Sequence, residues 1–335
     1  MKYFIIVLLF AVAALTACNT DNNGNNGTGA GTGTGTETAP TVRIAAMRGP
    51  TALGLLNLMN LSDNGETELD YEFTLLGSPD QVPPLLVQGN VDVAVIPANL
   101  ASILYNNDGL DVAALAIVTL GVLHIVDATG EINSVHDLRG RTIYASGQGA
   151  TPEFALNYVL EQNGLTPGVD VYVEFRAEHT ELAALLEAGL AEIALLPEPF
   201  ATTVVNRVDG LEFALDLTVE WDNVQPDYSL IMSAVVVRRE FLEAHPEIIR
   251  IFMSEYNDSI TMFHQDIPAT AELAVYYEII GAVPIALQAL PRTHVVFIYG
   301  EEMRSNLIGF FNVLYEANPG IIGGQVPANE FYFIP

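Results

Sequence analysis

The sequence predicts a two-lobed α/β fold that arose by internal duplication. Three observations predict it: residues 85–101 recur at 185–201, the offset of one hundred extends to both sides, and each copy contains an apolar run suited to a buried strand. The two copies cover roughly 44–115 and 144–216, far longer than a solenoid repeat. Identical residues meet at Leu85/Leu185, Leu86/Leu186, Gly89/Gly189, Ala94/Ala194, Pro97/Pro197 and Ala101/Ala201.

Each copy is expected to contain three strands and the helices between them. The predicted strands are 42–46, 70–76 and 91–96 in the first copy and 142–145, 171–175 and 191–196 in the second. Gly89 and Gly189 end a helix just before the third strand, and Pro97 and Pro197 end that strand. Helices are then expected at 98–104 and 199–205.

Prolines and small polar residues mark the helix starts after the strands. Pro50 suits a first helical turn, and Ser78 is expected to cap a helix that begins with Pro79. Thr151 is expected to cap the helix that continues with Pro152 and Glu153.

Two further apolar strands, 119–128 and 229–238, lie where the chain must pass between the lobes, and they predict a hinge. After Arg239 the pattern is helical through Pro319, with helices at 240–264, 269–280 and 300–317 on the first lobe. The expected organisation is a signal peptide at 1–17, an anchor and tether at 18–40, lobe 1 at 41–126 plus 237–335, and lobe 2 at 127–236.

The N-terminus has the pattern of a lipoprotein signal peptide. An apolar run, Phe4–Ala17, is too short for a comfortable membrane span and suits a signal peptide. Leu15-Thr16-Ala17-Cys18 resembles the bacterial lipobox, which implies cleavage before Cys18 and acylation there, with palmitate as the expected acyl group. The alternative is an ordinary secretory signal with an incidental cysteine. Residues 19–40, rich in Asn, Gly and Thr, predict a flexible tether with a reach of about 25 Å.

Composition excludes several classes of function. The formal charge of −29 should repel nucleic acid and anionic lipid headgroups, so we expect no nucleic-acid partner and membrane contact only through the lipid anchor. The six histidines lack metal-ligand spacing, and neither a Gly-x-Ser-x-Gly elbow nor a phosphate-binding loop is present. We therefore expect no enzyme activity, no metal and no cofactor.

The helix starts after the strands predict a ligand site, because the carboxyl ends of strands and helix N-termini meet at one edge of an α/β sheet. A small molecule held there between two lobes would meet backbone amides and a few side chains. The candidate ligand-binding residues are Arg48, Gly49, Thr51, Ser78, Pro97, Asn99, Gly121, Gln148, Gly149, Ala150, Thr151, Glu198, Phe200 and Trp221.

Several candidates have an equally ordinary structural explanation. Arg48 would bind an oxyanion or form a surface ion pair, and Glu198 would bind a cationic group or stabilise a helix N-terminus. The rings of Phe154, Phe200 and Trp221 would stack on a ligand or belong to the core. Trp221, which has polar neighbours, is the aromatic most expected to line the cleft.

Taken together, these motifs resemble the nitrate, sulfonate, taurine and thiamine-precursor branch of ABC-transporter substrate-binding proteins. The motifs that carry the resemblance are the lipobox, Arg48-Gly49-Pro50-Thr51, 96–100, 137–143, 147–152 and 196–200. The resemblance implies a type II periplasmic-binding-protein fold, with two lobes joined by two crossing strands. It also implies a monomer on the extracytoplasmic face of the cell membrane that delivers a small solute to a permease with its ATPase.

The ligand and the downstream partner stay open at this level. A cleft with one arginine and Glu198 favours an uncharged or zwitterionic organic molecule, for example one with a heteroaromatic ring. Two alternatives to an importer subunit are a sensory lipoprotein for a receptor kinase and a biosynthetic enzyme on the same fold, such as a menaquinone-pathway lyase or a yeast-type pyrimidine synthase.

Overall fold

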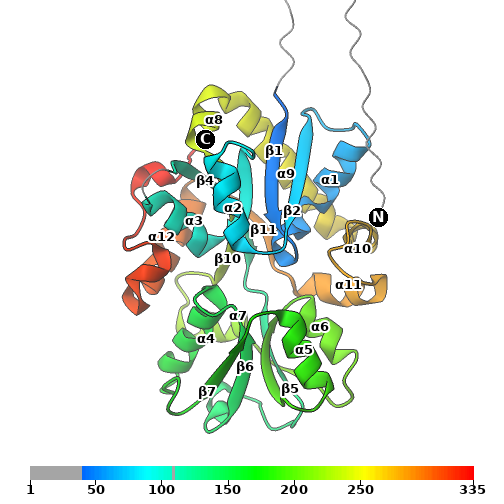
Figure 1. The fold of residues 1–335 in the computed structure, drawn as a ribbon, viewed down its shortest axis with the longest axis vertical. Coiled ribbons are helices and arrows are strands. Elements are labelled where there is room, and N and C mark those ends of the chain that lie inside the picture. Colours follow the sequence, from blue (N-terminus) through cyan, green and yellow to red (C-terminus); the bar gives the residue numbers. More distant parts are fainter. Residues whose placement is uncertain (1–39, 108–109) are drawn as a thin grey trace, which may run out of the picture. The chain divides into compact units, whose positions relative to one another are not determined.

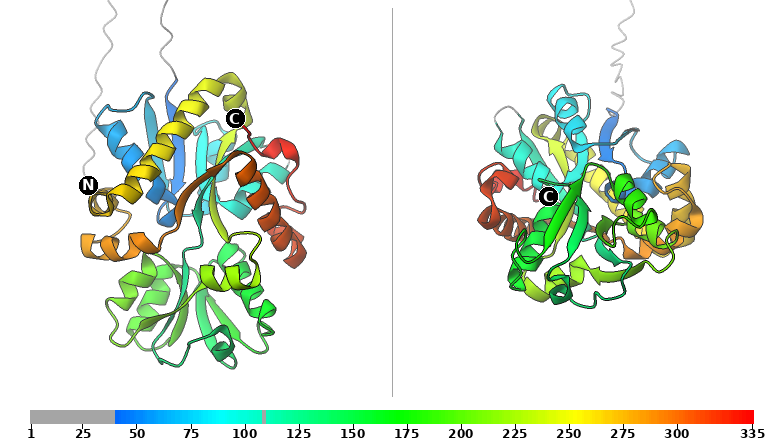
Figure 2. Two further views of the ribbon diagram at one scale, coloured as in Figure 1. Left: turned by 180° about the vertical axis from the view of Figure 1, so that it is seen from behind. Right: turned by 60° about the horizontal axis from the view of Figure 1, so that its bottom comes forward.

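The computed structural model describes residues 40–107 and 110–335, which form two mixed β-sheets with helices packed on both (Figures 1 and 2). The predicted signal peptide, Cys18 and almost all of the predicted tether lie outside the described residues. We refer to each sheet with its covering helices as the first or the second lobe.

The first sheet has six strands in the order β11-β4-β10-β3-β1-β2, and the second has five in the order β7-β6-β8-β5-β9. The strands of the first sheet are β1 (Val42–Met47), β2 (Tyr71–Leu76), β3 (Val93–Pro97), β4 (Val112–Leu120), β10 (Ile231–Arg238) and β11 (Val295–Tyr299). Those of the second are β5 (Leu123–Asp127), β6 (Thr142–Ser146), β7 (Tyr172–Arg176), β8 (Ile193–Pro197) and β9 (Glu212–Asp216).

This topology confirms the duplication. The strands β2-β1-β3-β4 of the first copy correspond to β7-β6-β8-β9 of the second, in the same spatial order. In each sheet one strand from outside the copy lies antiparallel between the third and fourth positions, β10 in the first sheet and β5 in the second. The two lobes therefore share one architecture, and the sheet of each lobe includes one strand from outside its own copy.

The helices also follow the repeat. Those of the two copies are α1 (Leu56–Asp63), α2 (Val82–Val87), α3 (Ala98–Asn106), α4 (Thr151–Gln162), α5 (His179–Glu187), α6 (Phe200–Val205) and α7 (Leu217–Val224). The remaining helices are α8 (Arg239–Ala244), α9 (Pro246–Gln265), α10 (Ile267–Tyr276), α11 (Val283–Ala289) and α12 (Gly300–Ala317). As predicted, Gly89 and Gly189 follow α2 and α5 in the left-handed conformation, each with φ of 66°.

The crossing between lobes differs from the predicted single strand at 119–128. β4 ends at Leu120, residues 121–122 connect the lobes, and β5 begins at Leu123 in the other sheet. The second crossing is the segment 225–230, which leads from α7 into β10. We therefore propose lobe boundaries within these two connections, in place of 126/127 and 236/237.

Two helix predictions after Arg239 were wrong in detail. The expected helix 240–264 is divided at His245, because the residue before a proline is disfavoured in the α conformation and Pro246 opens α9. Residues 295–299, expected within a helical region, form strand β11 at the edge of the first sheet. The run Val-Val-Phe-Ile-Tyr has the β-branched and aromatic residues that favour a strand.

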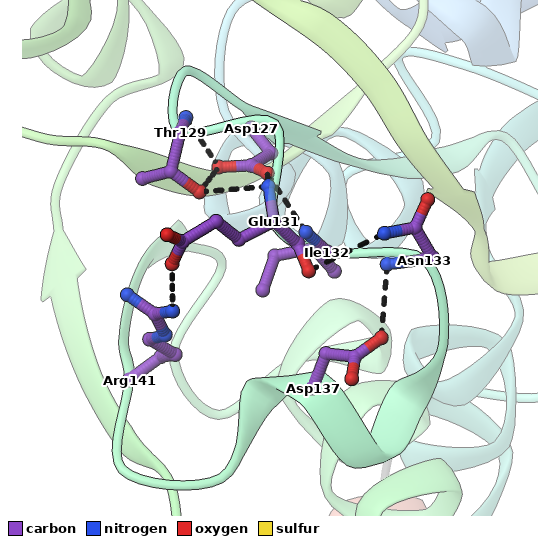
Figure 3. Close-up of polar contacts among 7 residues, drawn as sticks. All are labelled: Asp127, Thr129, Glu131, Ile132, Asn133, Asp137 and Arg141. Atoms are coloured by element: carbon purple, nitrogen blue, oxygen red, sulfur yellow. Dashed lines mark hydrogen bonds and ion pairs between the residues drawn. The ribbon is translucent and has the colours of Figure 1, made fainter.

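The turn after β5 is fixed by a buried carboxylate (Figure 3). Asp127 accepts hydrogen bonds from the Thr129 amide at 2.8 Å and its hydroxyl at 2.7 Å, and from the amides of Glu131 and Ile132 at 3.0 and 3.1 Å. Burial alone would raise the pKa of Asp127, but these bonds outweigh it and lower the pKa. The carboxylate therefore stays ionised and holds the start of the 127–141 segment.

The hydrophobic core is continuous between the lobes at Trp221. Its indole is fully buried, with ring centres 4.8 Å from Tyr158 of α4 and 6.0 Å from Phe310 of α12. Trp221 Nε1 donates to the Tyr228 carbonyl at 2.8 Å, and the Tyr228 ring packs on Gly309. The second crossing is thus packed between a helix of each lobe.

Candidate ligand-binding site

The predicted site lies where the strands of both sheets end. In the first lobe β1, β2 and β3 lead into helical turns at Pro50, Pro79 and Ala98, and in the second lobe β6, β7 and β8 lead into α4, α5 and α6. These loops carry most of the candidate residues. The parallel pairing of β1 with β2 and β3, and of β6 with β7 and β8, places their carboxyl ends together at one edge of each sheet.

Two candidates from different lobes meet directly. The Thr151 hydroxyl at the start of α4 donates to Asn99 Oδ1 at the start of α3, at 3.3 Å, and both residues are buried. Thr151 is therefore not the helix cap that we predicted: Ala150 holds the N-cap position and Thr151 is the first helical residue. The structure uses the hydroxyl to connect the two lobes instead.

A second cluster, which our sequence analysis missed, joins Ser146, His179 and Phe200. Ser146 Oγ lies 2.5 Å from His179 Nδ1, and the imidazole packs on the Phe200 ring with centres 4.8 Å apart. Burial lowers the pKa of His179 to about 4, so the imidazole is neutral at pH 7. The position of His179 at the helix start after the second strand was the available signal.

Arg48 is exposed at the end of β1, and among the residues that the structure describes its guanidinium reaches only the Glu278 carbonyl, at 3.5 Å. Nine of the eleven arginines form an ion pair within the described residues, and Arg48 and Arg292 do not. In a chain with 41 acidic residues, an arginine without a carboxylate partner at a strand end favours an anionic ligand over the surface ion pair.

The backbone amides that were expected to face a ligand are partly occupied by the chain's own side chains. Gln81 Oε1 accepts from the amides of Gly77 and Ser78 at 3.1 and 3.3 Å, and the Glu153 carboxylate accepts from the Gly149 amide at 2.6 Å. A ligand at these two loops would have to compete with those acceptors.

Glu198 stabilises a helix N-terminus, which was the structural alternative to a role in ligand binding. Its carboxylate is fully buried and accepts from the Thr202 amide at 3.1 Å and the Thr202 hydroxyl at 2.8 Å, at the start of α6. Burial raises the pKa of Glu198 although the Thr202 bonds oppose this. A role in ligand contact for Glu198 stays a prediction.

The remaining candidate residues differ in their exposure to solvent. Gln148 is exposed, Gly49 precedes the first helical turn with φ of 112°, and Thr51 and Pro97 are half-buried. Gly121 is buried: its carbonyl is bonded to His294, and a Cβ there would lie 2.1 Å from Thr218 Oγ1. Gly121 thus belongs to the first crossing, and Trp221, on α7, packs against the second. Phe154, weighed as a stacking ring, is half-buried against the core.

A hollow of about 370 Å³ borders this site between the lobes. Its walls are α5 and α6 on one side and residues 279–285 of the first lobe on the other, and Phe200 is part of the lining. The lining is mainly aliphatic, with Ala183, Val204 and Ile280 among its members. The volume is within the range of small-molecule sites.

Within residues 40–107 and 110–335, no group of three or more His, Cys, Asp or Glu side chains is arranged to hold a metal ion. In the same residues no helix has both the length and the apolar character needed to cross a bilayer.

Part of this chain matches a known protein family. Residues 62–215, from α1 to β9, match the family described as ABC transporter, phosphonate, periplasmic substrate-binding protein. These residues are similar to the ABC-transporter substrate-binding proteins. The matched residues include the first crossing and nearly all of the second copy.

Solved structures show the same fold for this chain. An ABC transporter protein from Parabacteroides distasonis matches with a TM-score of 0.74 and 21% identity, over 88% of this chain and 98% of that one. The aliphatic sulphonate binding protein SsuA from Escherichia coli matches with a TM-score of 0.72 and 15% identity, over 88% and 92%. The predicted type II periplasmic-binding-protein fold is confirmed.

A third structure is the alkanesulfonate-binding protein SsuA from Xanthomonas axonopodis bound to MOPS, with a TM-score of 0.63 and 13% identity over 86% and 94% of the chains. At these identities the likeness establishes the fold alone. No curated protein sequence matches this chain.

Proposed function

We propose that this chain is an extracytoplasmic solute-binding lipoprotein that captures a small organic solute between its lobes and delivers it to an ABC importer. The observation that carries the proposal is the meeting of Asn99 and Thr151 across the lobes, at the strand ends where the family's fold would hold a ligand. The Ser146, His179 and Phe200 cluster extends the same edge of the second lobe.

Capture would proceed by closure of the lobes about the segments 121–122 and 225–230. Both helices that meet at the Asn99–Thr151 contact begin at the cleft, so their N-termini provide partial positive charge there. Closure would remove the ligand from water and strengthen each of these polar contacts. The closed form would then dock on the permease through both lobes.

The solute we favour is a small organic oxyanion such as a phosphonate or a sulfonate, including zwitterionic ones. Because the buried Glu198 carboxylate is engaged by Thr202, it no longer argues against an anion in the cleft. Arg48 would supply the positive charge and His179 a neutral hydrogen-bonding nitrogen. A ring or alkyl substituent would pack on Phe200.

Titration of the purified chain with alkyl phosphonates, sulfonates, pyrimidines and amino compounds tests this proposal. We expect saturable heat of binding for at least one oxyanion at neutral pH. Binding confined to uncharged or cationic compounds would contradict the oxyanion assignment, and an absence of binding across all four classes would favour a sensory or enzymatic role.

Anchoring is tested separately at Cys18, the only cysteine. We propose that it carries the lipid that holds the protein on the outer face of the cell membrane. Cys18→Ala should move the protein from the membrane fraction to the soluble fraction, whereas Cys18→Ala that stays with membranes would exclude lipidation as the anchor. Ligand titration of the released protein serves as the control for folding.

A further inference from the structure

A set of side chains at the first crossing has no part in the proposed ligand site. The segment from the short helix η4 (Leu290–Arg292) to β11, in the first lobe, contacts the second lobe at Phe213 and the first crossing at Gly121. The Arg292 guanidinium lies 4.6 Å from the centre of the Phe213 ring on β9, and His294 Nδ1 donates to the Gly121 carbonyl. The Leu120 amide in turn donates to the His294 carbonyl at 2.9 Å.

His124, directly after the crossing, lies behind these contacts. Its side chain is 4% exposed, and its ring meets the edge of Phe213 with centres 5.3 Å apart and planes at 82°. His124 Nε2 is buried and has no hydrogen-bond partner within the described residues. An unpartnered buried nitrogen is rare in proteins and needs an explanation.

The surroundings of His124 contain both signs of charge. A hollow of about 280 Å³ separates the groups, with lining residues His124, Phe213, Ala214, Leu215, Asp216 and Arg292. Asp216 is opposite His124 in the β5–β9 register, Arg292 shares the hollow with both, and His294 is near enough to lower the pKa of His124. Glu198 is within electrostatic reach of Arg292 and Asp216, and Asp222 is within reach of His294 and Asp216.

We propose that Arg292 forms a latch on the second lobe, that His294 fixes the latch segment to the first crossing, and that protonation of His124 releases the latch. The neutral imidazole packs against Phe213, which also binds the Arg292 cation. A proton on His124 places a buried positive charge near Arg292 and His294, and its burial and repulsion outweigh the attraction of Asp216. The Arg292–Phe213 contact weakens, and the lobes are freed to open.

The direction of the pH effect follows from the environment. Burial lowers the pKa of His124, Arg292 and His294 lower it further, and Asp216 opposes them. The latched state is therefore favoured near neutral pH and loses stability as the pH falls below about 6.5, the ordinary value of histidine, through the lowered pKa of His124. Opening exposes His124 and restores its ordinary affinity for protons.

The distance between the lobes in the ligand-free protein tests the latch without reference to any solute. A chain that begins at Asn19 contains no cysteine, so Val87→Cys and Val169→Cys, at exposed positions of the first and second lobes, accept a pair of spin labels. We expect a single shorter distance at pH 8 and a growing longer one at pH 5. Each unit by which the pKa of His124 differs between open and closed states gives about a tenfold change in their ratio.

Variants separate the latch from general acid effects. His124→Phe keeps the aromatic packing without a proton site and should retain the shorter distance at pH 5, with an unchanged circular dichroism spectrum showing that it folds. Arg292→Gln should show the longer distance already at pH 8. His136→Gln, at an exposed site, should open as the parent does. A parent distance that is the same at both pH values, or a His124→Phe protein that opens like the parent, would overturn the proposal.

Discussion

Asp92→Ala is expected to lower the free energy of unfolding by about 3 kcal/mol, the largest single effect outside the apolar core. Asp92 is fully buried and accepts from Arg43 Nε at 2.8 Å, Arg43 Nη2 at 2.6 Å and the Arg43 amide at 3.2 Å. Arg238 Nη2, at the end of β10, donates to Asp92 Oδ1 at 3.4 Å. This carboxylate therefore ties together β1, β3 and the crossing strand β10.

Removing one partner from a buried ion network leaves the others with their desolvation cost and no compensating charge. Arg43 is partly solvated, which places the expected effect at the lower end of the range for buried pairs. Chemical denaturation of the parent and variant measures the difference.

The duplication supplies a matched control. Glu192 is the counterpart of Asp92 in the second copy, but it is exposed and forms no ion pair within the described residues. Glu192→Ala should change the free energy of unfolding by less than about 0.5 kcal/mol. Equal losses for the two variants would show that the buried network is not what stabilises the first sheet.

The second large effect is expected on ligand affinity. Arg48→Gln and His179→Gln should each weaken binding of an oxyanionic solute about 10- to 100-fold, or about 1.5–3 kcal/mol, because the first removes the positive charge and the second the ring and its fixed hydrogen-bonding nitrogen. His179→Gln retains hydrogen bonding but loses the ring that packs on Phe200. Calorimetric titration gives the affinity of each variant.

Arg139→Gln is the control, since Arg139 is exposed and paired with Asp170 at the far end of β7. It should bind like the parent. If Arg48→Gln binds the solute with the affinity of the parent, Arg48 is an ordinary surface residue and does not contact the solute.

Much of the fold was predictable because the duplication doubled each local signal. An apolar run such as 91–96 is ambiguous by itself, but the same run after Gly189 indicates a buried strand in both copies. The exchanged strands β5 and β10 were placed at the crossings by their position between the copies and after the second one.

The site predictions that were wrong or missing concerned contacts between segments that are distant in the sequence. Thr151 has the sequence of a helix cap, but its hydroxyl bonds Asn99, 52 residues away. Trp221 has polar neighbours in sequence, yet Tyr158 and Phe310 enclose its ring. The position of His179 at a helix start did not identify its partner, because Ser146 comes from a different strand. Local patterns specify elements, and side-chain partners across lobes are set by tertiary packing.

Native mass spectrometry of the chain from Asn19, purified without refolding and compared with the same sample after denaturation, tests solute capture most directly. The account predicts excess mass in the native spectrum that disappears on denaturation, and a released organic oxyanion that rebinds the parent but binds Arg48→Gln weakly. A released molecule without an anionic group, or one that binds both proteins equally, would contradict the account of the site.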